Sequence, residues 1–191
     1  MVGLDAATVI DAAWIVFLVY WFAAAFRLNR MKKREPASEW LLRFVVMGTA
    51  FVLLDGSLVQ FGDLNKRFFP HSAPVQAVGA ALTCLGVAFA IWARYHIGRY
   101  WSSTVSLRAD HQLIRTGPYA HIRHPIYTGI LLAVLGTAVA VGRYRAIVAF
   151  VIVLAGFTWK ASREEALLSG EFGPAFEEHK RVTGFFLPRF S

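Results

Sequence analysis

The chain has 191 residues, of which 57% are hydrophobic and 17% are charged, and its mean hydropathy is +0.49. Soluble domains have about 25% charged and about 45–50% apolar residues, so this composition excludes a disordered chain and argues against an ordinary soluble domain. The net charge of +8 is compatible with a nucleic-acid partner. In so apolar a chain, however, basic residues more often mark the cytoplasmic side of a membrane. The single cysteine, Cys84, excludes an internal disulfide.

Five apolar stretches predict membrane-spanning helices. The first three contain 21 residues each, and a helix of that length reaches about 31 Å, which matches the hydrocarbon core of a bilayer. The last two are shorter and four residues apart, which predicts a tight helical hairpin whose second arm continues as helix past Trp159. We therefore predict an all-α, multi-pass transmembrane bundle of about five spans that forms one domain over residues 1–191. The spans are expected at residues 6–26, 41–61, 75–95, 126–141 and 146–159.

The basic residues predict the orientation of these spans. Five Lys and Arg residues lie between positions 27 and 34, directly after the first span. When this cluster is placed inside, sixteen of the 20 Lys and Arg residues fall in or beside inside segments. The positive-inside rule then predicts an outside N-terminus and a cytoplasmic C-terminus, in the plasma (inner) membrane if the chain is prokaryotic. Because topology explains the charge, no nucleic-acid partner is expected. For Asp11 and Asp55, in the outer half, hydration or pairing is favoured over catalysis.

Nearly half of the polar residues lie in two segments on the predicted cytoplasmic side, 96–125 and 160–191. The first contains four histidines, but their spacing includes no H-E-x-x-H pair and no cysteine ligand accompanies them, so no metal is expected. Serines near Asp110 are compatible with a Ser–His–Asp hydrolase, but the G-x-S-x-G motif is absent. The histidines are His96, His111, His121 and His124.

Six short motifs occur in order along the C-terminal half of the chain, and together they resemble the signature of the isoprenylcysteine carboxyl methyltransferase family. That family comprises integral membrane methyltransferases that use S-adenosylmethionine, and its motifs are H-x-L-(I/V), G-x-Y, R-H-P-x-Y-x-G, E-E-x-x-L, F-G and L-P. In this chain they are His111 to Ile114, Gly117 to Tyr119, Arg123 to Gly129, Glu164 to Leu168, Phe172-Gly173 and Leu187-Pro188.

The resemblance implies S-adenosylmethionine as the cofactor and a pocket for it at the membrane surface. This molecule is zwitterionic at one end, planar at the adenine and positive at the sulfur, so its site requires polar groups, an apolar slot and aromatic faces. The motifs supply residues of these types. The residues implied to bind the cofactor are His111, Gln112, Leu113, Ile114, Tyr119, His124, Pro125, Ile126, Tyr127 and Glu165.

Lys160 and Glu164 form a second group of candidate residues, to which the resemblance assigns substrate handling or catalysis. If the last span continues as helix, their i, i+4 spacing places them on one face; a surface ion pair is the simpler alternative. The family has arginine at the position of Lys160, and lysine lacks the bidentate fork that suits a carboxylate. Two family tyrosines are replaced by Phe176 and His179.

The resemblance therefore implies methyl transfer to a lipophilic acceptor, with Tyr127 and Glu164 meeting in one pocket. A prenylcysteine-type carboxylate needs no base and is oriented by Lys160 or Arg163, whereas a hydroxyl, thiol or amine of another lipid needs Glu164 as the base. The absence of a G-x-G motif argues against soluble Rossmann-type and phosphatidylethanolamine methyltransferases. Two alternatives remain: an NADPH-dependent membrane reductase of the sterol reductase type, although Ile130 stands where those enzymes tend to have an acid, and a non-catalytic membrane protein.

Overall fold

The structure is a computed structural model of the chain that describes residues 5–26, 37–57, 62–98 and 113–190. In these ranges the regular structure is helical, without a named strand. The α-helices are α1 (Ala6–Phe26), α2 (Ala37–Asp55), α3 (Ala73–Ile97), α4 (Pro125–Val141), α5 (Tyr144–Phe172) and α6 (Pro174–Val182), and two short 3-10 helices are η1 (Gly62–Asn65) and η3 (Gly117–Ala120).

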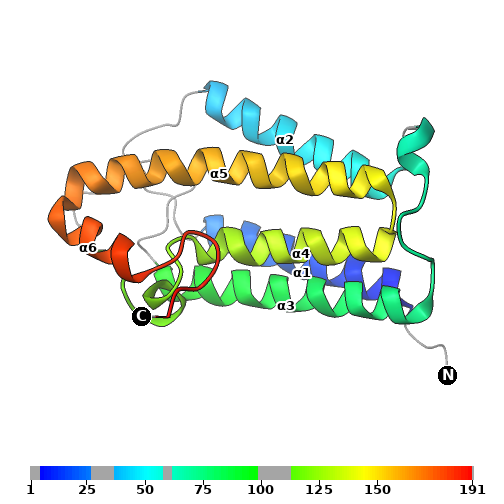
Figure 1. Cartoon of the computed structure of the whole chain (residues 1–191), viewed down its shortest axis with the longest axis horizontal. Coiled ribbons are helices and arrows are strands. Elements are labelled where there is room, and N and C mark those ends of the chain that lie inside the picture. Colours follow the sequence, from blue (N-terminus) through cyan, green and yellow to red (C-terminus); the bar gives the residue numbers. More distant parts are fainter. Residues whose placement is uncertain (1–4, 27–36, 58–61, 99–112, 191) are drawn as a thin grey trace.

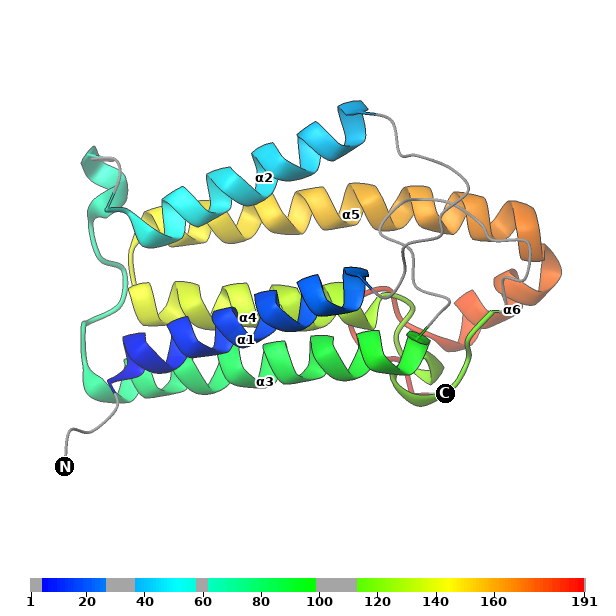
Figure 2. The same ribbon diagram turned by 180° about the vertical axis from the view of Figure 1, so that it is seen from behind.

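The five long helices lie side by side along the long axis of the molecule (Figure 1). In both views α2 lies along α5, and α1 lies along α3 and α4 (Figures 1 and 2). Helix α6, η3 and the C-terminus gather at one end, whereas η1 and the start of α1 lie at the other (Figures 1 and 2). Among the described residues, α1, α3 and α5 are long and apolar enough to cross a membrane, and α4 and part of α2 are shorter apolar helices. The expected all-α, multi-pass membrane bundle is confirmed.

The predicted end of the second span is wrong. The apolar stretch runs to Phe61, but α2 ends at Asp55. There the Asp55 carboxylate accepts a hydrogen bond from the Ser57 main-chain N–H at 3.1 Å, and Gly56 adopts a φ of +67°, a left-handed value that ends the helix. The other prediction on helix ends is confirmed, because α5 continues past Trp159 to Phe172.

Helices α3 and α4 pack closely along a seam of small residues. A Cβ atom at Gly129 would lie 2.6 Å from the main-chain nitrogen of Ala90, and one at Gly136 would lie 2.5 Å from that of Thr83. Without Cβ atoms the two backbones approach each other, which is a common way for helices to associate in lipid. Thr83 and Thr137 share a hydrogen bond of 3.2 Å across the seam.

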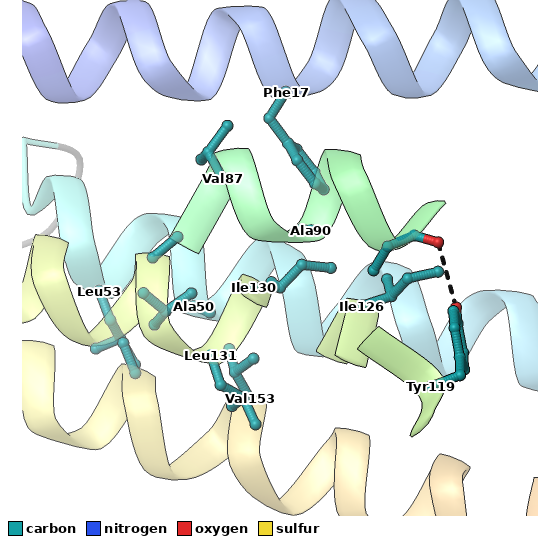
Figure 3. Packing of buried hydrophobic residues seen from close by; sticks show 14 residues of the cluster. Phe17, Ala50, Leu53, Val87, Ala90, Tyr119, Ile126, Ile130, Leu131 and Val153 are labelled. Atoms are coloured by element: carbon teal, nitrogen blue, oxygen red, sulfur yellow. Dashed lines mark hydrogen bonds between the residues drawn. The ribbon is translucent and has the colours of Figure 1, made fainter. Parts of the chain in front are cut away.

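The core of the bundle draws side chains from all five long helices (Figure 3). Phe17 of α1 lies beside Val87 of α3, and Leu131 of α4 lies beside Val153 of α5 (Figure 3). Large apolar side chains are also exposed on the outside of the helices, for example Phe22 at 65%. In a membrane-spanning bundle these outer side chains contact lipid tails, which are as apolar as the side chains themselves.

Candidate active site

The candidate active site begins with the segment that leads into α4. Gly117 opens the 3-10 helix η3 with a φ of +58°, and a Cβ at this position would overlap the ring of His96 at the end of α3. His124 is the N-cap residue of α4 and Pro125 is its first residue, where proline's fixed φ is well suited to starting a helix. The segment from η3 to Pro125 thus places the R-H-P-x-Y-x-G motif at the start of α4.

The C-terminal segment, residues 183–190, lies against this motif. Main-chain N–H groups of Arg123 and Gly184 donate to the carbonyls of Gly184 and His121, both at 2.9 Å. The Thr128 hydroxyl donates to the carbonyl of Phe186 at 2.7 Å. The last residues of the chain are therefore part of the site's framework, although they lie about 60 positions from the motif.

Glu165 of α5 joins the motif to the long helix. Its Oε1 atom accepts hydrogen bonds from Arg123 Nε at 2.6 Å and from His124 Nε2 at 3.1 Å. Arg123 also donates to the main-chain carbonyls of Lys180 and Thr183, near the end of α6. One carboxylate and one guanidinium thus connect α5, the start of α4 and the C-terminal part of the chain.

Tyr127 and Glu164 meet, as the family resemblance implies. The Tyr127 hydroxyl donates to Glu164 Oε1 at 2.6 Å, and Lys160 Nζ lies 3.9 Å from the same oxygen. Lys160 Nζ also lies 5.5 Å from the centre of the Tyr127 ring, within reach of a cation–π interaction. The predicted common face of Lys160 and Glu164 on α5 is therefore confirmed. His124 Nδ1 lies 3.7 Å from the second oxygen of Glu164, which places this imidazole between two carboxylates.

Aromatic rings stack beside these charged groups. The Tyr127 ring lies between His124 and Phe157, with ring centres 5.6 Å and 4.8 Å away and interplanar angles of 13° and 17°. Phe185 meets the His124 ring edge-on at 5.0 Å. Aromatic faces next to two carboxylates provide a surface that favours a cation and a planar group.

The other predicted cofactor residues lie beside the motif or outside the described part of the chain. Leu113 and Ile114 are half-buried just before η3, whereas Pro125 and Ile126 are buried in the first turn of α4. His111 and Gln112 lie outside the described residues.

Tyr119 is buried against α3. Its hydroxyl donates to the main-chain carbonyl of Ala93 at 3.5 Å (Figure 3). Burial, with a further contribution from the charge of Glu164, raises the pKa of Tyr119 far above its ordinary value. The phenol therefore remains neutral at any physiological pH and acts as a hydrogen-bond donor.

Sequence reasoning missed several residues that build the site. Phe157 lies within a predicted apolar span, where a phenylalanine gives no indication that it belongs to a binding site. Arg123 and Phe185 were part of, or close to, quoted motifs but were not selected. Phe176 and His179, which replace the family tyrosines, are buried at 1% and 4% exposure. Burial, together with the charges of Arg115 and Arg123, lowers the pKa of His179.

The fold and the site define a class: a multi-pass α-helical membrane protein with a polar and aromatic site at one end of its bundle. A family model, the isoprenylcysteine carboxyl methyltransferase (ICMT) family, matches residues 79–170. Over these 92 of its 191 residues the chain is similar to the isoprenylcysteine carboxyl methyltransferase family. The match includes most of α3, all of α4 and most of α5, which carry the seam and the Tyr127–Glu164 contact.

The chain is also similar in sequence to several individual proteins. The chain is 31% identical to protein-S-isoprenylcysteine O-methyltransferase of Schizosaccharomyces pombe, over 59% of this chain and 49% of the relative. It is 28% identical to a probable protein-S-isoprenylcysteine O-methyltransferase of Oryza sativa subsp. indica, over 93% of both chains. It is also 34% identical to the cobalt-zinc-cadmium resistance protein CzcN of Cupriavidus metallidurans, over 58% of this chain and 49% of the relative. The matches thus span about half the length of two of these relatives and nearly all of the third.

A solved structure has a similar fold. The structure of the eukaryotic intramembrane Ras methyltransferase ICMT (isoprenylcysteine carboxyl methyltransferase) aligns with a TM-score of 0.59 and 18% identity, covering 100% of this chain and 71% of that one. At this identity the likeness concerns the arrangement of the helices. Within the described residues of the present chain, no group of three or more His, Cys, Asp and Glu side chains is arranged to hold a metal ion.

Proposed function

We propose that this chain, as one integral membrane domain, transfers a methyl group from S-adenosylmethionine to a lipophilic carboxylate of the prenylcysteine type. The observation that carries the proposal is the contact between Tyr127 and Glu164, which joins two motifs 37 positions apart in one site. The names of the fission yeast and rice relatives support both the reaction and the class of acceptor.

The residues around Tyr127 fit S-adenosylmethionine. The stacked rings of His124, Tyr127 and Phe157 offer flat apolar faces, and Glu164 and Glu165 supply negative charge beside them. Rings and carboxylates together favour a positively charged sulfur. When bound, S-adenosylmethionine supplies a methyl group that is activated by its positive sulfur. We propose that the cofactor is held by Leu113, Ile114, Tyr119, His124, Pro125, Ile126, Tyr127 and Glu165, together with His111 and Gln112.

We propose that the chain contributes to the reaction by aligning the acceptor carboxylate with the methyl donor. A carboxylate acceptor needs no proton removed, so Lys160 acts by attracting and orienting it. Glu164 holds both Lys160 and Tyr127 in place, at 3.9 Å and 2.6 Å. Holding reacting groups in position accounts for a large part of the acceleration of such displacements. Compared with the arginine of the family, Lys160 offers a point charge rather than a bidentate fork.

We place the site on the cytoplasmic side of the membrane, with the N-terminus outside. The excess of Lys and Arg at the end of the bundle that carries the site supports this orientation. In a prokaryote the membrane would be the plasma (inner) membrane. After Cys84→Ser, a cysteine introduced at the exposed Glu171 should react with a membrane-impermeant maleimide in inverted vesicles and be protected in right-side-out vesicles. The reverse pattern would contradict the orientation.

The proposal is tested with purified full-length protein in detergent. We expect S-adenosylhomocysteine to bind and a labelled methyl group to reach a prenylcysteine analogue. Glu164→Gln should lower the rate about 100-fold, because misplaced reacting groups cost rate of that order. Glu171→Gln, which changes an exposed glutamate on the same helix, should leave the rate unchanged.

Other outcomes would contradict the proposal in distinguishable ways. An unchanged rate in Glu164→Gln would remove this residue from the mechanism. Protection against heat unfolding by NADPH, and none by S-adenosylhomocysteine, would favour a reductase. Cofactor binding without transfer to the prenylcysteine analogue, tested alongside fractionated membrane lipids, would indicate a different lipid acceptor or a non-catalytic protein.

A further inference from the structure

Basic side chains gather at the end of the bundle opposite the candidate active site, where the carboxylates of Asp55 and Asp63 also lie. Four basic residues gather there from two separate segments, the loop that follows η1 and the segment that joins α4 to the first turn of α5. Main-chain contacts join these segments: Arg67 and Arg143 form an antiparallel bridge, and the N–H of Tyr144 donates to the carbonyl of Lys66 at 3.2 Å. We call this group the opposite-end cluster: Lys66, Arg67, Arg143 and Arg145.

The three arginines of this cluster are bound to neutral groups. Arg67 donates to the carbonyl of Val141 at 3.3 Å, and Arg143 donates to that of Asn65 at 2.8 Å. Within the described ranges, no carboxylate lies within ion-pair distance of any of the three, and only Lys66 has an acidic partner, Asp63 at 2.7 Å. The guanidinium charges therefore stand close together without a matching anion at contact distance.

The start of α5 adds to this positive field. The helix macrodipole places partial positive charge at a helix N-terminus, where acidic side chains or bound anions are favourable. Here the N-cap residue is Arg143, no side chain caps the helix, and the first turn of α5 contains no acidic residue. A cation thus occupies the position where a carboxylate is preferred, which favours an anion supplied from outside.

Arg145 provides an independent observation. This residue is 7% exposed, and its guanidinium donates to the last carbonyls of α2, at 2.6 Å for Leu54 and 3.3 Å for Asp55. Its Nε atom, however, is buried without a hydrogen-bond partner. Buried donors normally have a partner, and an unpaired one is costly. The cluster therefore contains a buried, unused donor next to two more exposed arginines.

The surroundings of the cluster indicate a membrane–water interface. Helices α2 and α4 end here and α5 begins here. Phe68 lies between Phe69 and Tyr144, with ring centres 4.7 Å and 5.8 Å away, and Tyr144 is 47% exposed. Aromatic side chains gather at the headgroup level of bilayers. An anion at this depth that accepts bidentate hydrogen bonds from arginine is the phosphate of a lipid.

We propose that the opposite-end cluster binds the phosphate of an anionic lipid headgroup, in the leaflet farther from the candidate active site. The guanidinium groups of Arg67 and Arg143 hold the phosphate, and the N-terminus of α5 adds its dipole. The proposal does not depend on methyl transfer, so it can fail or succeed independently of the proposed function.

The test measures lipid binding to the full-length protein in a neutral detergent. We expect phosphatidylglycerol to raise the thermal unfolding midpoint and to bind more tightly than phosphatidylcholine, and inorganic phosphate at the same concentration to have no effect. The Arg67→Gln/Arg143→Gln variant should lose affinity for phosphatidylglycerol by about 30-fold, since each basic residue near a charged membrane contributes roughly fivefold. Glutamine retains a donor for the carbonyls of Val141 and Asn65.

Two further variants separate a site from a general effect of charge. Lys180→Gln/Arg181→Gln removes two positive charges from the other end of the bundle and should leave phosphatidylglycerol binding intact. Arg67→Lys/Arg143→Lys keeps the charge but loses the bidentate fork, so it should lose less affinity than the glutamine variant, and it also covers the case that the glutamine variant does not fold. Equal loss in the control variant, equal binding of phosphatidylcholine, or equal stabilisation by inorganic phosphate would overturn the proposal.

Discussion

The two ends of the helix bundle hold their cations in different ways. At the end with the candidate active site, Arg123 forms an ion pair with the carboxylate of Glu165 at 2.6 Å. At the opposite end, Arg67 and Arg145 donate to main-chain carbonyls. An ion pair between side chains neutralises both charges, whereas a carbonyl satisfies a donor and leaves the positive charge in place. The ion pair holds the side chains of the candidate active site in position. The carbonyl contacts leave the arginines at the opposite end able to attract an external anion.

The largest expected effect at the opposite end follows from removing Arg145. Arg145→Met should lower the free energy of unfolding by about 3 kcal/mol, because hydrogen bonds from a charged donor contribute about 1.5–3 kcal/mol each. This guanidinium holds the last carbonyls of α2. Unfolding in detergent by added SDS measures the change. Arg143→Met, which removes a single carbonyl contact, is the matched control and should cost less than half as much. Equal losses would contradict a special role of Arg145 in ending α2.

A smaller effect is expected at the site end from Arg123. Arg123→Gln removes the 2.6 Å contact with Glu165 and frees the neighbouring His124 and the C-terminal segment. If the proposed function holds, the Kd for S-adenosylhomocysteine should rise about tenfold, equivalent to about 1.4 kcal/mol. Titration calorimetry measures it. Arg115→Gln, which removes an exposed arginine 3.7 Å from Glu178, should leave the Kd unchanged. A wild-type Kd in Arg123→Gln would show that this ion pair does not position the site.

The smallest expected effect concerns pH and His179. Burial and two nearby arginines lower the pKa of His179 below its ordinary value of 6.5. As the pH falls through 6.5, the unfolded chain therefore takes up a proton before the folded protein does, and stability decreases. The stability that depends on neutral His179 is fully present above pH 6.5 and is lost as the pH falls towards the lower pKa of His179 in the folded protein. His179→Gln should flatten this part of a plot of thermal midpoint against pH. An unchanged slope would exclude His179 as its source.

The membrane helices were predictable from the sequence, with one error. Long runs of apolar residues predicted the helices at 6–26 and 75–95, and the structure has them at Ala6–Phe26 and Ala73–Ile97. The end of α2 was wrong by six residues because hydropathy continues past Asp55. The hydrogen bond to Ser57 and the carbonyl contacts of Arg145 end that helix, and neither leaves a signal in an apolar average.

The candidate site was predictable only in part. The i, i+4 spacing of Lys160 and Glu164 predicted their shared face, since a helix has 3.6 residues per turn. The meeting of Tyr127 with Glu164 was expected from the family resemblance, because no local spacing relates residues of different helices. The stacking of Phe157 on Tyr127 depends on how α4 packs against α5 and had no separate signal.

The apolar runs of the sequence are enough to specify a bundle of apolar helices, because a backbone in lipid must satisfy its hydrogen bonds internally. The sequence also determines where charge accumulates along the chain. Which helices pair and which charged side chains meet depends on the packing of the folded chain. Helices α3 and α4 approach each other closely at Gly129 and Gly136. Arg123 binds a carboxylate, whereas Arg145 binds main-chain carbonyls. Both features depend on distances between segments that lie far apart in the chain.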